Sequence, residues 1–401
     1  MTLDITRVAS QVGEMLDKLK ADNRLLLEHL QYARDTVNDP NLNIEKLKRK
    51  IASSRGSVTY LVAGLYDGFN HSYPAPQAPP EFSVLATDGS HIDMDRNRAV
   101  RCYLINIGRV FLHYGADPQA NLESLPHLYC RPEELQIADS AQPGQRRPMD
   151  STLLGVLRGV EEMEYLADLA SQQARGSRNL ALVDGTLVRW GLESYPDYIT
   201  DELLKRRFLG SLEKVRMLNE SQDVALASYI SLPRSTEVVN ALRVAVCPQD
   251  APDCDRCRQV AGQQACDAVD GVQDQMLFSA WLKPGERSDL FFSQSSLVEK
   301  YYGVSRIYFF YLRVEDEIAR VEVPEWLIRK PGLLDLTHVL VLDQCRRGQG
   351  YPVALSEAHE KAVVSGSDRE EFWALVDESM LEEKMSTETS LKSQSKKSRW
   401  V

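Results

Sequence analysis

Two aspartates stand at matching places in two apolar segments of the chain. Residues 82–87 lead into Asp88, and residues 180–183 lead into Asp184; each aspartate is followed by a glycine and then a hydroxyl residue. An apolar run of this length that ends in a glycine turn predicts a buried strand. Acids at the ends of two neighbouring strands could share a divalent metal ion, so these residues are the first candidates for chemistry.

A helix is predicted between the two strands, from residue 149 to about residue 175. Asp150 or Ser151 can cap its start. The helix carries four acids, Glu161, Glu162, Glu164 and Asp168. A strand Asp, a helical Glu and a second strand Asp form the arrangement that ribonuclease H-like nucleases use. Such carboxylates suit two Mg²⁺ or Mn²⁺ ions about 4 Å apart, which activate a water and hold the charge that develops as a phosphodiester is hydrolysed.

Other interpretations of these acids remain open at this point. Asp-Gly is a common turn dipeptide, and acids on a helix usually form a solvated face. An actin-like ATPase also carries Asp and Gly after a strand, but its loops place a residue between the two and continue through further glycines, which neither segment does. No Walker-type Gly-x4-Gly-Lys-Ser/Thr sequence is present, so a partner would have to supply any ATP-driven motor.

A late run of residues favours the nuclease interpretation. Gly350-Tyr351-Pro352 is followed by Glu357-Ala358-His359. Together with the two Asp-Gly strands, this run resembles the NurA family, nucleases that process 5′ DNA ends with the hexameric helicase HerA. The resemblance covers about residues 80–380. It implies an α/β fold with a ribonuclease H-like (PIWI-like) mixed sheet core and flanking helices, two-metal hydrolysis that prefers Mn²⁺, and a homodimer docked on HerA.

The resemblance also assigns site residues. Asp88 and Asp184 match the two strand acids, and Tyr351 and His359 match the family's late Tyr and His. Asp88 would bridge both ions, and Asp184 would hold one of them. His359 would complete a metal shell or act as general acid to the leaving oxygen, and Tyr351 would orient a phosphate or a water. A single helical His and a half-buried Tyr are also common structural residues.

The helical ligand is less clearly assigned. Glu164 lies 20 residues before Asp184, close to the family's usual offset, and is the first choice. Glu161 lies one turn earlier on the same helix face and is the alternative.

Four cysteines crowd into one segment with the spacing C-x6-C-x2-C-x8-C, namely Cys247, Cys254, Cys257 and Cys266. Four thiolates can hold a tetrahedral Zn²⁺ or a [4Fe–4S] cluster. The segment departs from the NurA pattern and is interpreted as an insertion at 245–272. Reduced loop cysteines, or one disulfide, are the alternative.

The 401 residues are 43% hydrophobic, which is ample for a core. We expect an N-terminal helical region at 1–72, a proline-rich connector, a NurA-like nuclease domain at 81–380 and a disordered tail at 381–401. Further predicted strands include two antiparallel strands within 98–114 and one at 339–342.

The formal net charge of −11 argues against a protein that coats DNA through its whole surface, but a local basic groove is sufficient for contact. Arg234 and Arg320 are the foremost candidates for phosphate contact. Weaker candidates are Lys205, Arg206, Arg207 and Arg243, with Trp190 or Tyr229 for stacking. No apolar run spans a membrane and the N-terminus does not resemble a signal peptide, so a cytoplasmic protein is expected.

The resemblance implies a metal-dependent DNA nuclease, a 5′–3′ exonuclease and single-strand endonuclease. It would act on single-stranded DNA and duplex ends during end resection for double-strand break repair, with a HerA-type hexameric ATPase. The alternative is a catalytically inactive DNA-end clamp or helicase adaptor.

Overall fold

The computed structural model describes residues 4–95, 98, 100–142, 144–259, 262 and 264–383. Contacts among them define two units. Unit 1 contains the described residues of 1–75, 230–299 and 306–322, and unit 2 contains those of 76–229, 300–305 and 323–401. Within the described ranges, no helix is both long and apolar enough to cross a membrane.

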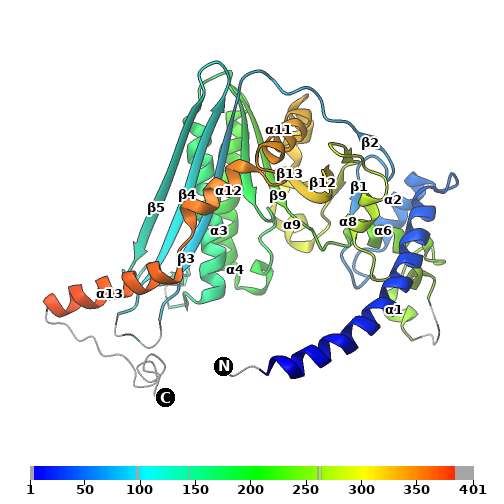
Figure 1. Ribbon diagram of the computed structural model, residues 1–401, viewed down its shortest axis with the longest axis horizontal. Helices are drawn as coiled ribbons and strands as arrows, with labels where there is room; N and C mark the ends of the chain where they lie inside the picture. The colour runs from blue at the N-terminus through cyan, green and yellow to red at the C-terminus, as the bar shows by residue number, and fades with distance from the viewer. Residues whose placement is uncertain are drawn as a thin grey trace. The chain divides into compact units, whose positions relative to one another are not determined.

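Five described strands of unit 2 lie side by side in a mixed sheet (Figure 1). Their order is β5 (Gln119–Tyr129), β4 (Tyr103–Tyr114), β3 (Phe82–Ile92), β8 (Arg178–Asp184) and β9 (Asp223–Ile230). β3, β4 and β5 pair antiparallel, whereas β3, β8 and β9 run parallel. The chain thus builds an antiparallel meander first and adds two parallel strands after α3 (Ser151–Ser171).

Helices cover both faces of this sheet. α3 contacts β3, β4 and β8, and α12 (Val353–Ala362) contacts β3, β4 and β5. Figure 1 shows the two helices on opposite faces. Val84, Leu85 and Ala86 in β3 are therefore fully buried although they alternate between the faces. This double burial is why a continuous apolar run correctly predicts β3 and β8.

The start of α3 is also as predicted. The Asp150 carboxylate accepts a hydrogen bond from the backbone N–H of Leu153 at 2.9 Å and so caps the helix. The other regular elements of unit 2 are β6 (Gln136–Ala138), β7 (Arg146–Pro148), α4 (Asp197–Thr200), a π-helical segment (Asp201–Phe208), α5 (Leu209–Leu218), α10 (Glu325–Arg329), α11 (Leu333–Arg347) and α13 (Gly366–Glu382).

Two strand predictions are wrong. Residues 98–114 do not hold two antiparallel strands, because β4 runs unbroken to Tyr114 and pairs with β5. The run 339–342 lies inside α11, where all four of its side chains are buried. A short apolar run cannot distinguish a strand from a helix that is buried on every side.

Unit 1 combines helices with short strands. These are α1 (Ile5–Val37), α2 (Ile44–Ser53), β1 (Gly64–Leu65), β2 (Ser72–Tyr73), α6 (Glu237–Val246), α7 (Cys254–Cys257), α8 (Asp274–Ser279), β10 (Arg287–Ser288), β11 (Phe291–Phe292), α9 (Ser296–Tyr301), β12 (Ile307–Val314) and β13 (Glu317–Pro324). Aromatic rings form the centre of its core, where Phe278 stacks on Tyr311 with ring centroids 4.5 Å apart. α1 and α2 fall within the predicted N-terminal helical region at 1–72, which also contains β1 and shares one unit with residues 230–299 and 306–322.

The expected disordered tail at 381–401 falls almost wholly outside the described residues. Of that range, Leu381 and Glu382 complete α13.

Candidate active site

Two acids lie side by side on the sheet, because β8 ends at Asp184 and Asp88 is on the neighbouring β3, which continues past the predicted strand end to Ile92. The two strands run in parallel register, with Thr87 opposite Val183. Asp88 and Asp184 are the next residues on their strands, so both carboxylates lie at the same level. Parallel strands present their carboxyl ends at one edge, which is where open α/β sheets bind ligands.

α12 brings His359 to the first of these acids. The His359 Nδ1 atom lies 2.8 Å from Asp88 Oδ2. A carboxylate only accepts hydrogen bonds, so Nδ1 carries the proton, and in the neutral imidazole Nε2 is an acceptor. The His359 side chain is 64% exposed, whereas the Asp88 side chain is 16% exposed. The imidazole is therefore oriented by Asp88 while its other nitrogen is open to a substrate.

Tyr351 contacts the second acid. Its hydroxyl donates a hydrogen bond to Asp184 Oδ1 at 3.0 Å, and its ring packs edge-on against buried Tyr229, with centroids 5.5 Å apart. Desolvation of the phenol and the charge of Asp184 raise the pKa of Tyr351. Desolvation and the nearby Asp88 also raise the pKa of Asp184, although the Tyr351 hydrogen bond opposes this. Tyr351 thus remains a neutral donor at physiological pH.

A glycine of β4 lets α12 approach the sheet closely enough for these contacts. Gly108 pairs with Asp88 across the β3–β4 ladder, so both positions face α12. A Cβ at Gly108 would lie 2.0 Å from the backbone oxygen of Ala358. Asn106, on the same face of β4, donates hydrogen bonds to the carbonyls of Lys361 and Ala362 at the end of α12.

We expect Gly108→Ala to displace α12 and with it His359. The clash is with backbone, which cannot rotate away, so overpacking should lower the free energy of unfolding by about 1–3 kcal/mol. Gly155→Ala in α3 is the matched control, because a Cβ there meets nothing within 4 Å. That substitution should stabilise the helix by up to about 1 kcal/mol. Urea unfolding of both variants checks this, and equal stabilities would contradict the close approach.

The two glutamates expected as the helical ligand do not point to this edge. Glu164 makes a two-pronged ion pair with Arg207, with N–O distances of 2.8 and 2.6 Å. Glu161 is buried and accepts a 2.5 Å hydrogen bond from the Tyr129 hydroxyl. Both carboxylates are therefore engaged with other partners of unit 2.

Glu162, which was not selected from the sequence, lies beside the strand acids instead. Its side chain is buried, and among the described residues its Oε1 atom makes no hydrogen bond, although Arg158 Nε lies 3.2 Å away out of alignment. A Cβ at Gly89 would be 2.7 Å from that oxygen, so the glycine after Asp88 leaves the space that this carboxyl fills. Burial, with repulsion from Asp88 and Asp184, raises the pKa of Glu162 to about 7, against the effect of Arg158 and Arg189.

A sequence signal for Glu162 exists in retrospect. It shares a helical row with Leu166 and Leu169, both buried. An acid in line with buried leucines faces the sheet.

Comparison with known families identifies the chain. Residues 82–364 match the model of the NurA domain family. The chain belongs to the NurA family. The match includes the two strand acids, the three glutamates of α3, Tyr351 and His359. No curated protein matches the chain. A NurA domain implies a nuclease that takes part in DNA end processing.

The cysteine segment of this NurA-family protein does not assemble the expected zinc or [4Fe–4S] site. Within the part of the chain that the structure describes, no group of three or more His, Cys, Asp or Glu side chains lies close enough together to hold a metal ion. Cys247, Cys254, Cys257 and Cys266 are free thiols. Cys257 donates its S–H to Gln264 Oε1 at 2.9 Å, so its thiol is used in a local contact.

The carboxylates at the sheet edge do not form a closed cage in the described residues either. They nevertheless fit a metal better than the cysteines do, because Glu162 has a buried oxygen without a hydrogen bond. Burial and repulsion from Asp88 and Asp184 raise the pKa of Glu162, and burial and repulsion from Asp88 raise the pKa of Asp184. A divalent cation would bind that oxygen and offset the repulsion. Oxygen ligands with one imidazole nearby suit Mg²⁺ or Mn²⁺.

The structure separates the two foremost DNA-contact candidates, both in unit 1. Arg234 is exposed. The prediction for Arg320 is wrong, because its side chain is 3% exposed, is ion-paired with Glu237 and Glu322 at 2.6 and 2.9 Å, and lies over the ring of Phe309. A guanidinium buried in this way stabilises the core of unit 1 and is not available to a phosphate.

The weaker contact candidates are mostly engaged as well. Lys205 pairs with Asp201, Arg206 with Glu202 and Arg243 with Asp270, while Tyr229 is fully buried and Trp190 is 44% exposed. Of the two aromatic residues, only Trp190 has a surface on which a base could stack.

Proposed function

We propose that this NurA-family protein is a metal-dependent DNA nuclease whose centre is formed by Asp88, Glu162 and Asp184, with Tyr351 and His359 beside them. The observation that carries the proposal is the pair of contacts His359–Asp88 and Tyr351–Asp184. They join a late helix and its preceding loop to β3 and β8, and both are polar contacts of partly exposed side chains.

The three carboxylates would hold the divalent ions. Asp88 interacts electrostatically with both Glu162 and Asp184, so it would be one of the residues that hold the ions. When bound, such ions activate the attacking water and stabilise the charge on the attacking and leaving oxygens. Ribonuclease H-like proteins use acids on these elements, and the strand order of unit 2, a meander followed by a helix and two parallel strands, supports that fold.

The remaining groups act on protons and orientation. His359 Nε2, left as an acceptor, can take a proton from water and return it to the leaving oxygen. Asp88 fixes the ring for this transfer. Tyr351, held neutral, donates to Asp184 and keeps that carboxylate turned to the edge.

The finer parts of the proposal rest on the family resemblance. They are a preference for Mn²⁺, 5′–3′ exonuclease and single-strand endonuclease activity, a homodimer, and action in the cytoplasm with a HerA-type hexameric translocase in double-strand break repair. Arg234 is kept as a DNA contact because it is exposed.

End-labelled single-stranded and duplex DNA incubated with the purified protein tests the proposal. We expect degradation with Mn²⁺, less with Mg²⁺, and none with EDTA, because the carboxylates cannot activate water without a cation. DNA binding that persists under all these conditions without cleavage would favour the inactive clamp instead.

A further inference from the structure

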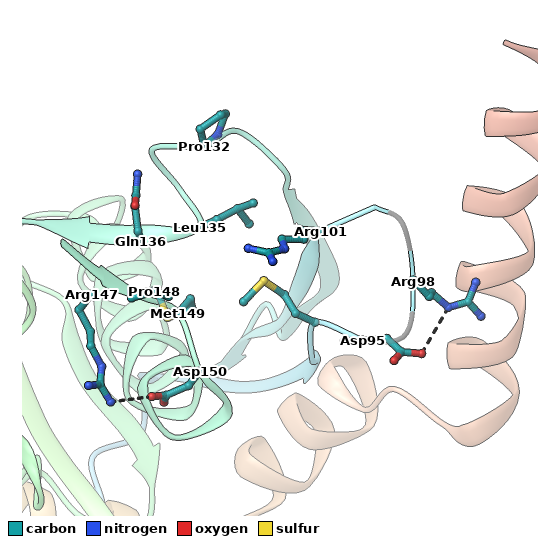
Figure 2. A pocket seen from close by; sticks show the side chains of 11 residues that line it. Asp95, Arg98, Arg101, Pro132, Leu135, Gln136, Arg147, Pro148, Met149 and Asp150 are labelled. Atoms are coloured by element: carbon teal, nitrogen blue, oxygen red, sulfur yellow. Dashed lines mark hydrogen bonds and ion pairs between the residues drawn. The ribbon is translucent and has the colours of Figure 1, made fainter. Parts of the chain in front are cut away.

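A pocket of about 950 Å³ opens in unit 2 beyond the sheet edge that carries Asp88. Its lining includes Asp95 and Arg98 after β3, Leu135 and Gln136 around the start of β6, and Pro148 at the end of β7 (Figure 2). A volume of this size is typical of sites for nucleotide-sized ligands.

The pocket lies in the direction in which two elements leave the candidate active site. β3 continues four residues past Asp88 to Ile92, about 13 Å at the rise of a strand. α3 runs from Glu162 back through Arg158 to its cap Asp150, about 18 Å at the rise of a helix. Both paths end at the pocket, so a strand a few nucleotides long could reach from the acids to it.

The arginines that line the pocket differ in whether an acid pairs with them. Arg98 is held by Asp377 at 2.7 Å and lies over the ring of Trp373. Arg147 pairs with Asp150 at 3.0 Å. Arg101 is exposed and makes no ion pair with any described residue.

The side chain of Arg101 is directed into the pocket. Figure 2 shows it pointing away from Asp95 and Arg98 and toward Leu135. Leu135, Pro148 and Met149 form an apolar part of the pocket wall, beside the polar residues Asp95, Gln136 and Asp150. A cation facing an apolar wall is complementary to a nucleotide, with its phosphate on the guanidinium and its base against the wall.

We propose that this pocket, through Arg101, binds the phosphodiester backbone of the single DNA strand that extends from the cleavage site. This inference rests on the proposed nuclease function. It adds a strand-binding subsite that would favour long substrates over short ones, since a short substrate at the acids cannot reach Arg101.

Arg101→Gln tests the subsite, with Arg178→Gln as the matched control. Arg178 is also exposed but begins β8, at the opposite edge of the sheet. Fluorescence anisotropy measures the binding of a labelled 20-nucleotide oligothymidylate in EDTA. Titrations at several KCl concentrations give the affinity and its salt dependence. We expect Arg101→Gln to weaken binding about threefold to tenfold and to reduce the slope of log K against log salt by about 0.7, the value for one phosphate contact to a single strand.

Hydrolysis assays distinguish a failure of the proposed subsite from a failure of the proposed nuclease function. With Mn²⁺, Arg101→Gln should lower kcat/KM on the oligonucleotide but leave hydrolysis of bis(p-nitrophenyl) phosphate unchanged, and Arg101→Lys should restore most of the loss. If the Arg101→Gln and Arg178→Gln variants bound the oligonucleotide with equal affinity and equal salt dependence, the proposed subsite would be wrong. If the wild-type protein hydrolyses neither substrate, the proposed nuclease function fails instead.

Discussion

Asp88→Asn should abolish Mn²⁺-dependent DNA cleavage, with a fall in kcat of about a thousandfold or more. The amide keeps the size of the side chain and can still accept the hydrogen bond of His359, so the geometry of α12 is preserved. What is lost is the negative charge that we place between two cations. A single-turnover assay with end-labelled single-stranded DNA measures the effect without interference from product release.

A second measurement on the same variant separates chemistry from folding. Asp88 repels Glu162 and Asp184 in the metal-free protein, so Asp88→Asn should melt at an equal or higher temperature than wild type in EDTA. The upward shift in Tm that Mn²⁺ produces in wild type should disappear. Asp168→Asn is the matched control, because Asp168 is on α3 but exposed and paired with Lys214. Cleavage by Asp88→Asn within tenfold of wild type would show that the centre lies elsewhere.

The sequence predicts the strand acids well because two simple physical rules determine their place. An apolar run covered on both faces suits a buried strand, and the parallel pairing of β3 with β8 brings Asp88 and Asp184 to the same level. Tyr351 and His359 could be assigned only through the family resemblance, since nothing in the sequence shows that α12 crosses β4. That crossing depends on Gly108, whose missing side chain is informative only once its partner helix is known.

Charged residues are harder to place. Arg320 and Arg234 are equivalent as sequence features, but one is buried between two glutamates and the other is exposed. Glu322 is a local partner of Arg320, but Glu237 is 83 residues away in the chain, so no local pattern shows that the two acids enclose this arginine. The cysteine spacing permits a metal site, but spacing alone does not orient four thiols toward one point.

The three glutamates of α3 show the limit most clearly. Successive helical residues are turned by about 100°, so an error of one or two positions in the offset selects a different face. Glu161 accepts a hydrogen bond from Tyr129, and Glu164 pairs with Arg207. Glu162, in contrast, lies beside the strand acids Asp88 and Asp184. Packing against β3, and the space above Gly89, decide which one reaches the acids.

Glu162→Gln should therefore lower cleavage about a hundredfold or more, whereas Glu164→Gln should stay within about threefold of wild type. The two variants make the same chemical change two positions apart on one helix, so each controls for the other. Loss of the partly exposed Glu164–Arg207 ion pair should reduce stability by less than about 1 kcal/mol. If Glu164→Gln were the inactive variant, the helical ligand would lie at the family's usual distance before Asp184 in the sequence. The assignment of Glu162 would then be wrong.

The pH dependence of stability tests the same carboxyl without any catalysis. The folded-state pKa of Glu162 is raised from 4.5 to about 7, so between these values the folded protein binds a proton more tightly than the unfolded chain does. Its contribution to stability is present below pH 4.5 and is lost as the pH rises through 7, with a slope of at most about 1.4 kcal/mol per pH unit. In EDTA, Glu162→Gln should be more stable than wild type at pH 8 and equal to it near pH 4, as measured by urea unfolding. Mn²⁺ at pH 8 should stabilise wild type and narrow the gap, because the cation favours the ionised carboxylate. If the free energies of unfolding of the two proteins changed with pH in the same way, Glu162 would not be buried beside Asp88 and Asp184.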